Sequence, residues 1–286
     1  MKTVVQDKDK WSASAGTYAK GSSHLSNAPV ETLFTQMNNA YPFSSASAIM
    51  DVGSGPGNTI GRLIDNYGSE LPSASRLIAS DFSAGMIEQV QRIQQEKKDE
   101  NPTWSRVEAK VLDAQVLEGI EDASISHITG TMVYNLVANG RQALEAAHRA
   151  LQPGGIIGMT LGAGAEWMDL MAIAAKKIRG ETAPTYQFPK DYGTLEGIKA
   201  EFEAVGFNAE HIGTIESFID VSNPKPLIDV FIRGKNPGAM FFVGDYSEAE
   251  LGAFVDEVLR LMEKKHPEMP RLLKGLMIVA VGKKLG

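Results

Sequence analysis

The sequence predicts an α/β fold in which a doubly wound, mostly parallel sheet of seven strands carries helices on both faces. Short apolar runs, each long enough for one strand, alternate with segments whose apolar residues recur at helical spacing. A cluster of glycines follows the first of these runs, where a strand would turn into a helix. Of the 286 residues, 43% are hydrophobic and 22% are charged, which is typical of a globular protein with a full core.

The alternation begins at residues 48–52, an apolar run that leads into the glycine cluster. The next segment is helical, with apolar positions on one face at Ile60, Leu63, Ile64 and Tyr67. A second strand is expected at residues 76–80. Ser83 can then cap a helix, because a serine hydroxyl accepts hydrogen bonds from the free amides of a first turn. Strands separated by helices in this rhythm become parallel neighbours.

The remaining strands are expected at residues 106–112, 125–131, 156–161, 209–218 and 274–282. A helix with Leu144, Ala147 and Leu151 precedes the turn Pro153-Gly154-Gly155, and another helix is expected at residues 195–205. A strongly amphipathic helix carries Leu251, Phe254, Val255, Val258 and Met262 on one face. The stretch 223–244 contains proline and glycine, and its position before the last strand indicates an insertion.

Composition and charge narrow the classes of function. The net charge of −7 argues against a nucleic-acid partner, since phosphate backbones attract basic surfaces. Residues 1–11 carry charges where a signal peptide would be apolar, and runs such as 276–281 are too short to span a membrane. The chain has no cysteine, which excludes disulfides and thiolate catalysis. We therefore expect a cytoplasmic protein without a membrane partner.

The most informative segment is Asp51-Val52-Gly53-Ser54-Gly55-Pro56-Gly57, at the predicted strand-to-helix turn. Glycine allows a tight turn there and lets a ligand approach the backbone without a Cβ in the way. A dinucleotide-binding fingerprint would need a third glycine at position 58, which is Asn58. A nicotinamide dehydrogenase is therefore a weaker alternative.

A second signal is Asp81-Phe82-Ser83-Ala84-Gly85-Met86, after the second strand. A carboxylate at this strand end can accept hydrogen bonds from both hydroxyls of a ribose. Phe82 offers a flat apolar surface beside an adenine. The alternative is that Asp81 is an ordinary surface or helix-capping acid.

Three glycines spaced two apart and preceded by an acid resemble motif I of the class I S-adenosylmethionine-dependent methyltransferases. The Asp-x-Ser-x-x-Met pattern resembles their ubiquinone and menaquinone C-methyltransferase branch. The resemblance covers residues 10–162 and implies S-adenosylmethionine as cofactor, with the adenine amino group on Asp113. The cofactor residues that we predict are Tyr18, Asp51, Gly53, Ser54, Gly55, Gly57, Asp81, Phe82, Met86, Asp113, Ala114 and Thr131.

The resemblance also suggests how the chain is divided. Trp11, Ala15 and Tyr18 are similar to an amino-terminal segment that closes over the cofactor in this branch, although the same spacing also suits simple packing. We therefore predict a helical lid at residues 1–45 and a methyltransferase domain at 46–286. Within that domain, residues 221–272 are expected to form an insertion on the substrate side.

Methyl transfer needs no metal and no covalent enzyme intermediate, and no histidine or carboxylate cluster has metal-ligand spacing. His24, in the predicted lid, is a candidate base; a solvent-exposed loop histidine is the alternative. Tyr134, after the fourth strand, either contacts the substrate or fills the helix–sheet interface. His127, inside that strand, is expected to be a hydrogen-bonded core residue.

The predicted function is methylation of a small organic molecule, such as a secondary metabolite, by S-adenosylmethionine. One alternative keeps the fold and cofactor but catalyses a dehydration, cyclisation or other rearrangement. Another is a nonenzymatic module that binds a nucleotide or regulates a partner. A small-molecule substrate is the expected partner, a homodimer is left open, and the acceptor atom (oxygen, nitrogen or carbon) is not fixed by the sequence.

Overall fold

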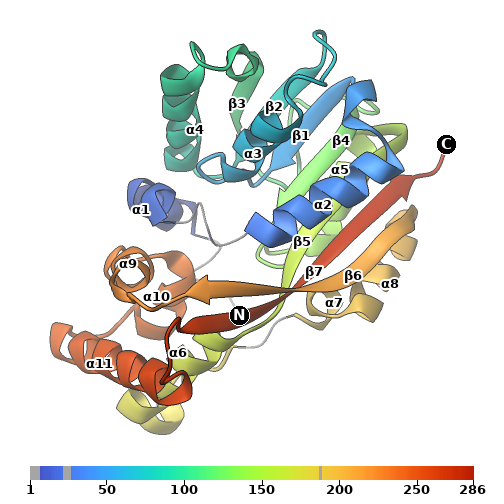
Figure 1. Ribbon diagram of the computed structural model, residues 1–286. Coiled ribbons are helices and arrows are strands. Elements are labelled where there is room, and N and C mark those ends of the chain that lie inside the picture. The colour runs from blue at the N-terminus through green and yellow to red at the C-terminus, as the bar shows by residue number, and fades with distance from the viewer. Residues whose placement is uncertain (1–6, 22–26, 187–188) are drawn as a thin grey trace.

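The computed structural model describes residues 7–21, 27–186 and 189–286. It contains a seven-stranded sheet with the order β3-β2-β1-β4-β5-β7-β6 (Figure 1). The strands are β1 Ala48–Val52, β2 Arg76–Asp81, β3 Val107–Val111, β4 Ile125–Thr131, β5 Leu151–Ala165, β6 Phe207–Asp220 and β7 Leu272–Lys284. The first five run parallel, whereas β7 is antiparallel to both of its neighbours. The predicted fold class is confirmed.

Helices cover both faces of the sheet (Figure 1). On one face, α5 and α8 pack in a core cluster with Met50 of β1, and on the other α2 and α3 pack in a cluster with Ile49. Successive strand residues point to opposite faces, so every residue of β1 is buried. The bounds of these helices are α2 Asn27–Ala40, α3 Asn58–Tyr67, α4 Ala84–Lys97, α5 Gly140–Ala150, α7 Lys190–Gly193 and α8 Leu195–Val205. Short 3₁₀ helices are η2 Phe43–Ser45, η3 Pro102–Arg106 and η4 Gly180–Thr182.

Most predicted elements agree with the structure. Residues 48–52 coincide with β1, and Ser83 caps α4 by accepting from the Met86 amide at 3.2 Å. One assignment was wrong, because Leu151 does not continue the α5 helix. It begins β5 and pairs with Ile125. The last strands are longer than predicted, since β5 and β6 pair with β7 over almost its whole length.

The amino-terminal segment consists of two helices with different surroundings. Leu33, Phe34 and Met37 of α2 are fully buried against the sheet, so α2 is part of the core. The first helix, α1 (Lys8–Gly21), instead lies beside α4 and next to the helices that follow β6 (Figure 1).

A third core cluster lies beyond the ends of β5, β6 and β7 and forms what we call the cap. It is built from α6 (Glu166–Arg179) and the segment between β6 and β7. That segment contains α9 (Lys225–Leu227), the π-helical turn η5 (Ile228–Arg233), α10 (Pro237–Val243) and α11 (Glu248–Lys265). The predicted amphipathic face of α11 is confirmed, with Phe254, Val255, Val258 and Met262 buried.

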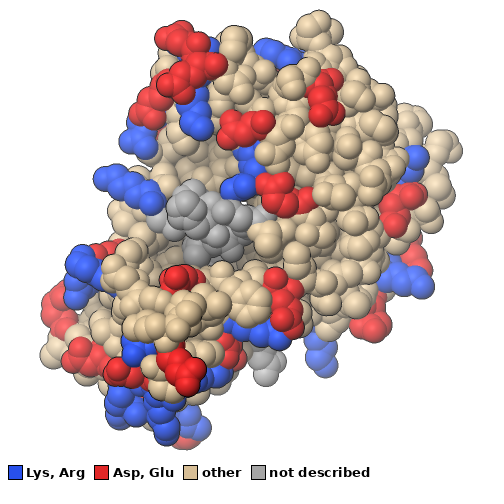
Figure 2. All heavy atoms as spheres, in the orientation of Figure 1, with Lys and Arg blue, Asp and Glu red and all other residues tan. Residues whose placement is uncertain are grey.

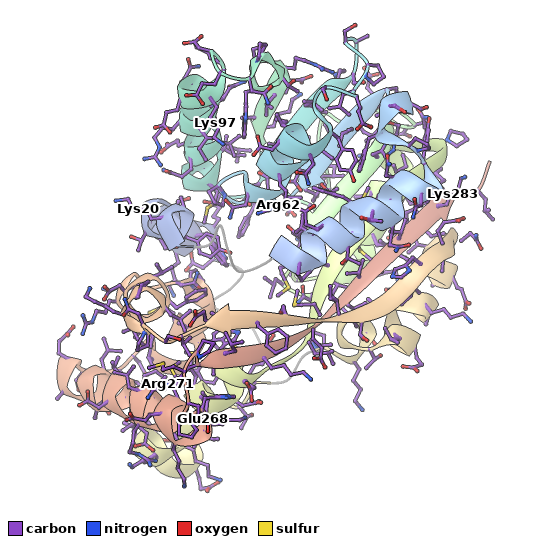
Figure 3. All side chains as sticks on the ribbon, in the orientation of Figure 1. Lys20, Arg62, Lys97, Glu268, Arg271 and Lys283 are labelled. Carbon is purple, nitrogen blue, oxygen red and sulfur yellow. The ribbon has the colours of Figure 1, made fainter. Side chains whose placement is uncertain are left out.

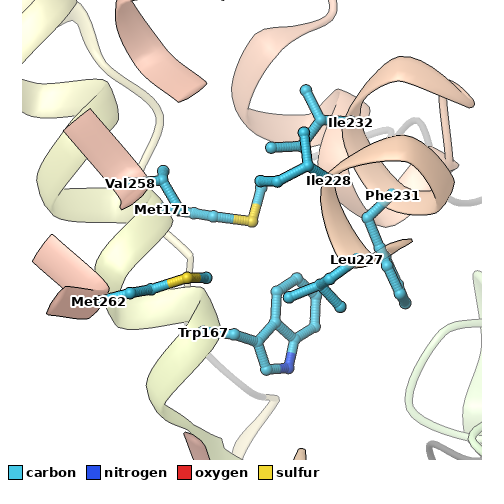
Figure 4. Close-up of a pocket in the computed structure, with 8 residues that line it drawn as sticks. All are labelled: Trp167, Met171, Leu227, Ile228, Phe231, Ile232, Val258 and Met262. Atoms are coloured by element: carbon cyan, nitrogen blue, oxygen red, sulfur yellow. The ribbon is translucent and has the colours of Figure 1, made fainter. Parts of the chain in front are cut away.

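The cap core is closely packed. A void of about 10 Å³ separates α6 from η5 and α11, and its walls are apolar (Figure 4). The residues around it are Trp167, Met171, Leu227, Ile228, Phe231, Ile232, Val258 and Met262. This void is close to the minimum that holds one water molecule, so it is a packing gap and not a ligand site.

Candidate functional site

The glycine loop joins the end of β1 to the start of α3. Gly53, Gly55 and Gly57 have φ angles of +62°, +53° and +93°, in the left-handed region that favours glycine. A Cβ on Gly53 would lie 2.3 Å from Cγ2 of Val133, so that position has no room for a side chain. A Cβ on Gly55 would have no described atom within 4 Å. The backbone of Gly55 therefore faces open space, where a ligand can approach it.

Asp81, at the end of β2, ties this loop to the next helix. Its Oδ2 accepts from the amide of Gly55 and its Oδ1 from the amide of Ser83, both at 2.9 Å. The carboxyl group is buried, and burial raises its pKa above the usual range, although these amide hydrogen bonds favour the charged form. The two predicted motifs thus form one structure, and the unused lone pairs of Asp81 can accept from a ligand.

A second buried acid lies in β1, two residues before Gly53 of the glycine loop. Asp51 of β1 is completely buried, and Oγ1 of Thr129 donates to its Oδ1 at 2.8 Å. Burial raises the pKa of Asp51 to about 7, against hydrogen bonds from Thr129 and the Ile60 amide, and nearby Asp81 raises it further. A cation bound beside this edge of the sheet would favour the charged form of Asp51.

The α1 helix lies against the start of α4, beside Asp81. Oγ of Ser12 is 2.9 Å from Oγ of Ser83 and accepts from the amide of Gly85 at 3.3 Å. A Cβ on Gly85 would lie 2.7 Å from the Ser12 carbonyl oxygen, so glycine permits this approach. Burial, and secondarily the charge of Asp81, raise the pKa of Tyr18 on the same helix, and the Tyr18 ring meets the Trp11 ring edge to face at 5.7 Å. Sequence reasoning missed Ser12, and the glycine in the second motif was the signal available for it.

The other predicted cofactor residues lie at neighbouring strand ends. Oγ1 of Thr131, at the end of β4, is 2.8 Å from Oγ1 of Thr59 in α3. Asp113 follows β3, is exposed and accepts from the Gln115 amide, while Ala114 is buried. Phe82 is partly buried and Met86 is buried in the first turn of α4. In open α/β sheets, the carboxyl ends of parallel strands are where ligands bind.

Of the two candidate catalytic residues, the structure describes only Tyr134. His24 lies outside the described residues. Tyr134 is 1% exposed and packs in the core cluster beside Gly130, where a Cβ would come within 2.5 Å of its ring. Burial, and secondarily the charge of Asp51, raise the pKa of Tyr134. This packing suits the helix–sheet interface, and the catalytic role of Tyr134 stays a prediction.

The prediction that His127 is a core histidine is confirmed. Its Nε2 lies 2.9 Å from the carbonyl oxygen of Tyr41 and its Nδ1 lies 2.9 Å from Oγ of Ser126. Burial lowers the pKa of this imidazole to about 4. Within the described ranges, no group of three or more histidine and carboxylate side chains could hold a metal ion. None of the described helices combines the length and apolar character needed to cross a bilayer.

Comparison with known proteins decides the family. Residues 49–155 match the family described as "Methyltransferase domain". The chain is 30% identical over 276 residues to methyltransferase ucsB of an Acremonium species, which covers 96% of this chain and 94% of that protein. The chain belongs to the class I S-adenosylmethionine-dependent methyltransferases. It is also 27% identical over 199 residues to methyltransferase tpcH of Aspergillus fumigatus, covering 67% of this chain and 68% of that protein.

Solved structures share the fold of this methyltransferase. The YcgJ protein of Bacillus subtilis has a TM-score of 0.57 at 16% identity, covering 90% of this chain and 99% of that one. The [4+2]-cyclase SpnF has a TM-score of 0.51 at 17% identity, covering 90% of this chain and 81% of that one. The methyltransferase assignment replaces the dehydrogenase and nonenzymatic alternatives. The ubiquinone-like branch stays a prediction.

The site has the features that the methyltransferase cofactor requires. The open side of Gly55 is a place that a Cβ would fill, and Asp81 has acceptor capacity beside it. When bound, S-adenosylmethionine supplies an activated methyl group with a thioether leaving group, so the protein mainly has to bind and orient the reactants.

Proposed function

We propose that this methyltransferase transfers the methyl group of S-adenosylmethionine to a small organic molecule, including secondary metabolites. The observation that carries this proposal is the convergence of the bare Gly55 backbone, Asp81 and the α1 helix at the carboxyl edge of the sheet. Two relatives named as methyltransferases, both from fungi, support it.

We assign the cofactor contacts from this geometry and the family resemblance. The glycine loop from Gly53 to Gly57 would face the cofactor with its backbone. Asp81 would accept from the ribose hydroxyls, while Phe82 and Met86 would border the adenine and Asp113 its amino group. Tyr18 would close the site from α1, the helix whose Ser12 contacts the start of α4. Thr131 and Asp51 would border the site from the β4 and β1 ends.

Replacing Asp81 with alanine should weaken binding of S-adenosylhomocysteine by about 1.5 to 3 kcal/mol, since hydrogen bonds to a charged acceptor are lost. The Gly55 and Ser83 amides would also lose their shared acceptor. Calorimetric titration measures the effect. Asp256→Ala, which removes an exposed acid on α11, is the control and should bind like the parent protein. Unchanged affinity of Asp81→Ala would remove this residue from the site.

One alternative function has a specific observation in its favour. SpnF, whose structure shares this fold, is named a [4+2]-cyclase. A protein that uses the cofactor pocket without methyl transfer would keep all the binding residues. Incubation with methyl-labelled S-adenosylmethionine and a library of phenols, carboxylic acids and amines tests the proposal. Label in an organic product supports methylation, whereas product formation without consumption of the cofactor supports the alternative.

The base for the acceptor is a separate part of the proposal. We retain His24 as the candidate that removes a proton when the acceptor is a hydroxyl, on the basis of its place after Tyr18 in the sequence. Tyr134 is retained as a candidate substrate contact.

A further inference from the structure

A cleft of about 740 Å³ lies between α1 and the cap. Lys10, Ser14 and Thr17 of α1 line one side, and residues around η5 and α10 line the other. In Figure 1, α1 lies between α4 and the α9–α10 part of the cap, and the contacts of α1 agree. The volume is within the usual range for small-molecule sites, about 300 to 1,000 Å³.

The lining of the cleft is mainly basic, whereas the protein as a whole has a negative net charge. Four of its five charged lining residues are cations, namely Lys10, Arg179, Arg233 and Lys235, and Asp245 is the acid. The whole chain has a net charge of −7. On the face shown in Figure 2, basic and acidic groups are interspersed. A concave surface lined mainly by one sign of charge focuses the field and attracts the opposite sign.

Nearby carboxylates neutralise part of this charge from outside the cleft lining. Asp7 pairs with Lys10, Asp229 with Arg233, and Glu250 with Arg179. None of these three acids is among the described residues that line the cleft. Arg179 also pairs with Asp245, at 3.2 Å, and Asp245 itself lines the cleft. The remaining charged lining residues are the cations Lys10, Arg233 and Lys235, so the lining keeps an excess of positive charge.

Lys235 is the cation best placed for a ligand. Among the described residues it has no ion-pair partner, and its side chain is exposed. Its φ angle is +54°, a left-handed conformation that is unfavourable for a lysine. Lys235 follows the π-helical turn η5 and Gly234. A Cβ added to Gly234 would lie 2.7 Å from Cγ2 of Thr17, so glycine permits α1 to approach closely here. Strained residues and π-helical turns are both concentrated at functional sites.

Aromatic rings form the other part of the cleft wall. Phe241, Phe242 and Tyr246 line it, and the Phe241 and Phe242 rings meet edge to face at 5.2 Å. The Arg179 guanidinium lies 4.5 Å from the centre of the Tyr246 ring. Apolar ring surface next to cations suits a ligand with a flat apolar body and a negative group.

The cleft shares α1 with the cofactor motif. Ser12 lies on the side of α1 that contacts Ser83, whereas Lys10 and Thr17 line the cleft on the side that faces the cap. We propose that the cleft binds the acceptor substrate and that this substrate is an aromatic molecule carrying a carboxylate or phenolate. This inference rests on the proposed function, since it treats the ligand of the cleft as the molecule to be methylated.

The test uses the full chain, 2-naphthoate and its neutral counterpart 2-naphthamide. Binding is measured by calorimetry with S-adenosylhomocysteine present. The variant Arg233→Gln/Lys235→Asn removes two cations from the cleft, and asparagine tolerates the left-handed conformation at position 235. Lys97→Gln, at the far end of α4 (Figure 3), is the matched loss of a lysine away from the cleft.

We expect the parent protein and Lys97→Gln to bind naphthoate more tightly than naphthamide. The double variant should bind naphthoate roughly tenfold more weakly, as expected for two partly screened charge contacts, and keep its affinity for naphthamide. Its circular dichroism spectrum and its binding of S-adenosylhomocysteine should be unchanged. If naphthoate does not bind, or the double variant binds it like the parent, the substrate class is wrong. If the parent protein does not bind S-adenosylhomocysteine, the proposed function itself is contradicted.

Discussion

A Gly55→Val variant should lose detectable binding of S-adenosylhomocysteine and keep its fold. The Cβ of residue 55 points into space with no described atom within 4 Å, so the valine side chain meets ligand and not protein. Its branched side chain would occupy the volume where the cofactor meets the loop, with an expected loss of affinity of roughly 10³-fold or more, about 4 kcal/mol. Calorimetry measures binding, and circular dichroism checks the fold.

Gly154→Val is the matched control for this variant. Gly154 also has a positive φ, +76°, and open space at its Cβ position among the described residues, but it lies near the amino-terminal end of β5. Both substitutions place a branched residue in a left-handed conformation, so they cost similar backbone strain. Only Gly55→Val should lose the ligand. If Gly55→Val binds normally, the cofactor does not lie over this loop.

Asp51→Asn should remove a large part of the pH dependence of stability. The pKa of Asp51 is raised to about 7 by burial, whereas in the unfolded chain it is near 4. Between these values the folded protein holds a proton that the unfolded chain has lost, so the free energy of unfolding falls as the pH rises from 4 to 7. Asparagine does not titrate. At pH 8 the variant should be more stable than the parent by about 4 kcal/mol, and near pH 4 the difference should vanish.

Thermal or urea unfolding across this pH range measures the difference between the two proteins. The asparagine introduced by this substitution could still accept the hydrogen bond from Thr129, so the packing around it is kept. Taking the difference cancels shifted groups that do not interact with Asp51, such as His127. Asp256→Asn, an exposed change on α11, should follow the parent curve. If the free energies of unfolding of the parent and Asp51→Asn change in parallel with pH, burial of the Asp51 carboxylate does not destabilise the folded protein.

The same variant connects stability to function. If Asp51 borders the cofactor, as we propose, Asp51→Asn should gain stability above pH 7 and lose cofactor affinity. Functional sites often keep groups that destabilise the folded chain. Asp51, a buried carboxyl group with a pKa of about 7, is such a group.

Features that depend on local sequence could be predicted. Residues 48–52 form a strand because they are a short apolar run, and Ser83 caps α4 because its hydroxyl reaches an amide three residues later. The glycine loop was recognisable because left-handed backbone at positions 53, 55 and 57 needs glycine within the loop itself. The family followed from these motifs in their order.

The tertiary structure decided the features that depend on contacts between distant segments. Asp81 meets Gly55 across 26 residues and Ser12 meets Gly85 across 73, and no periodicity in the chain encodes such pairs. The same limit applies to α2, which looked like part of a lid and is core, and to the cap, whose core joins α6 to the segment after β6. Sequence alone thus determined the fold class, the cofactor and the family. Tertiary packing decided where the cleft lies and which charges line it, because side chains from α1, α6 and α10 become neighbours only when the chain folds.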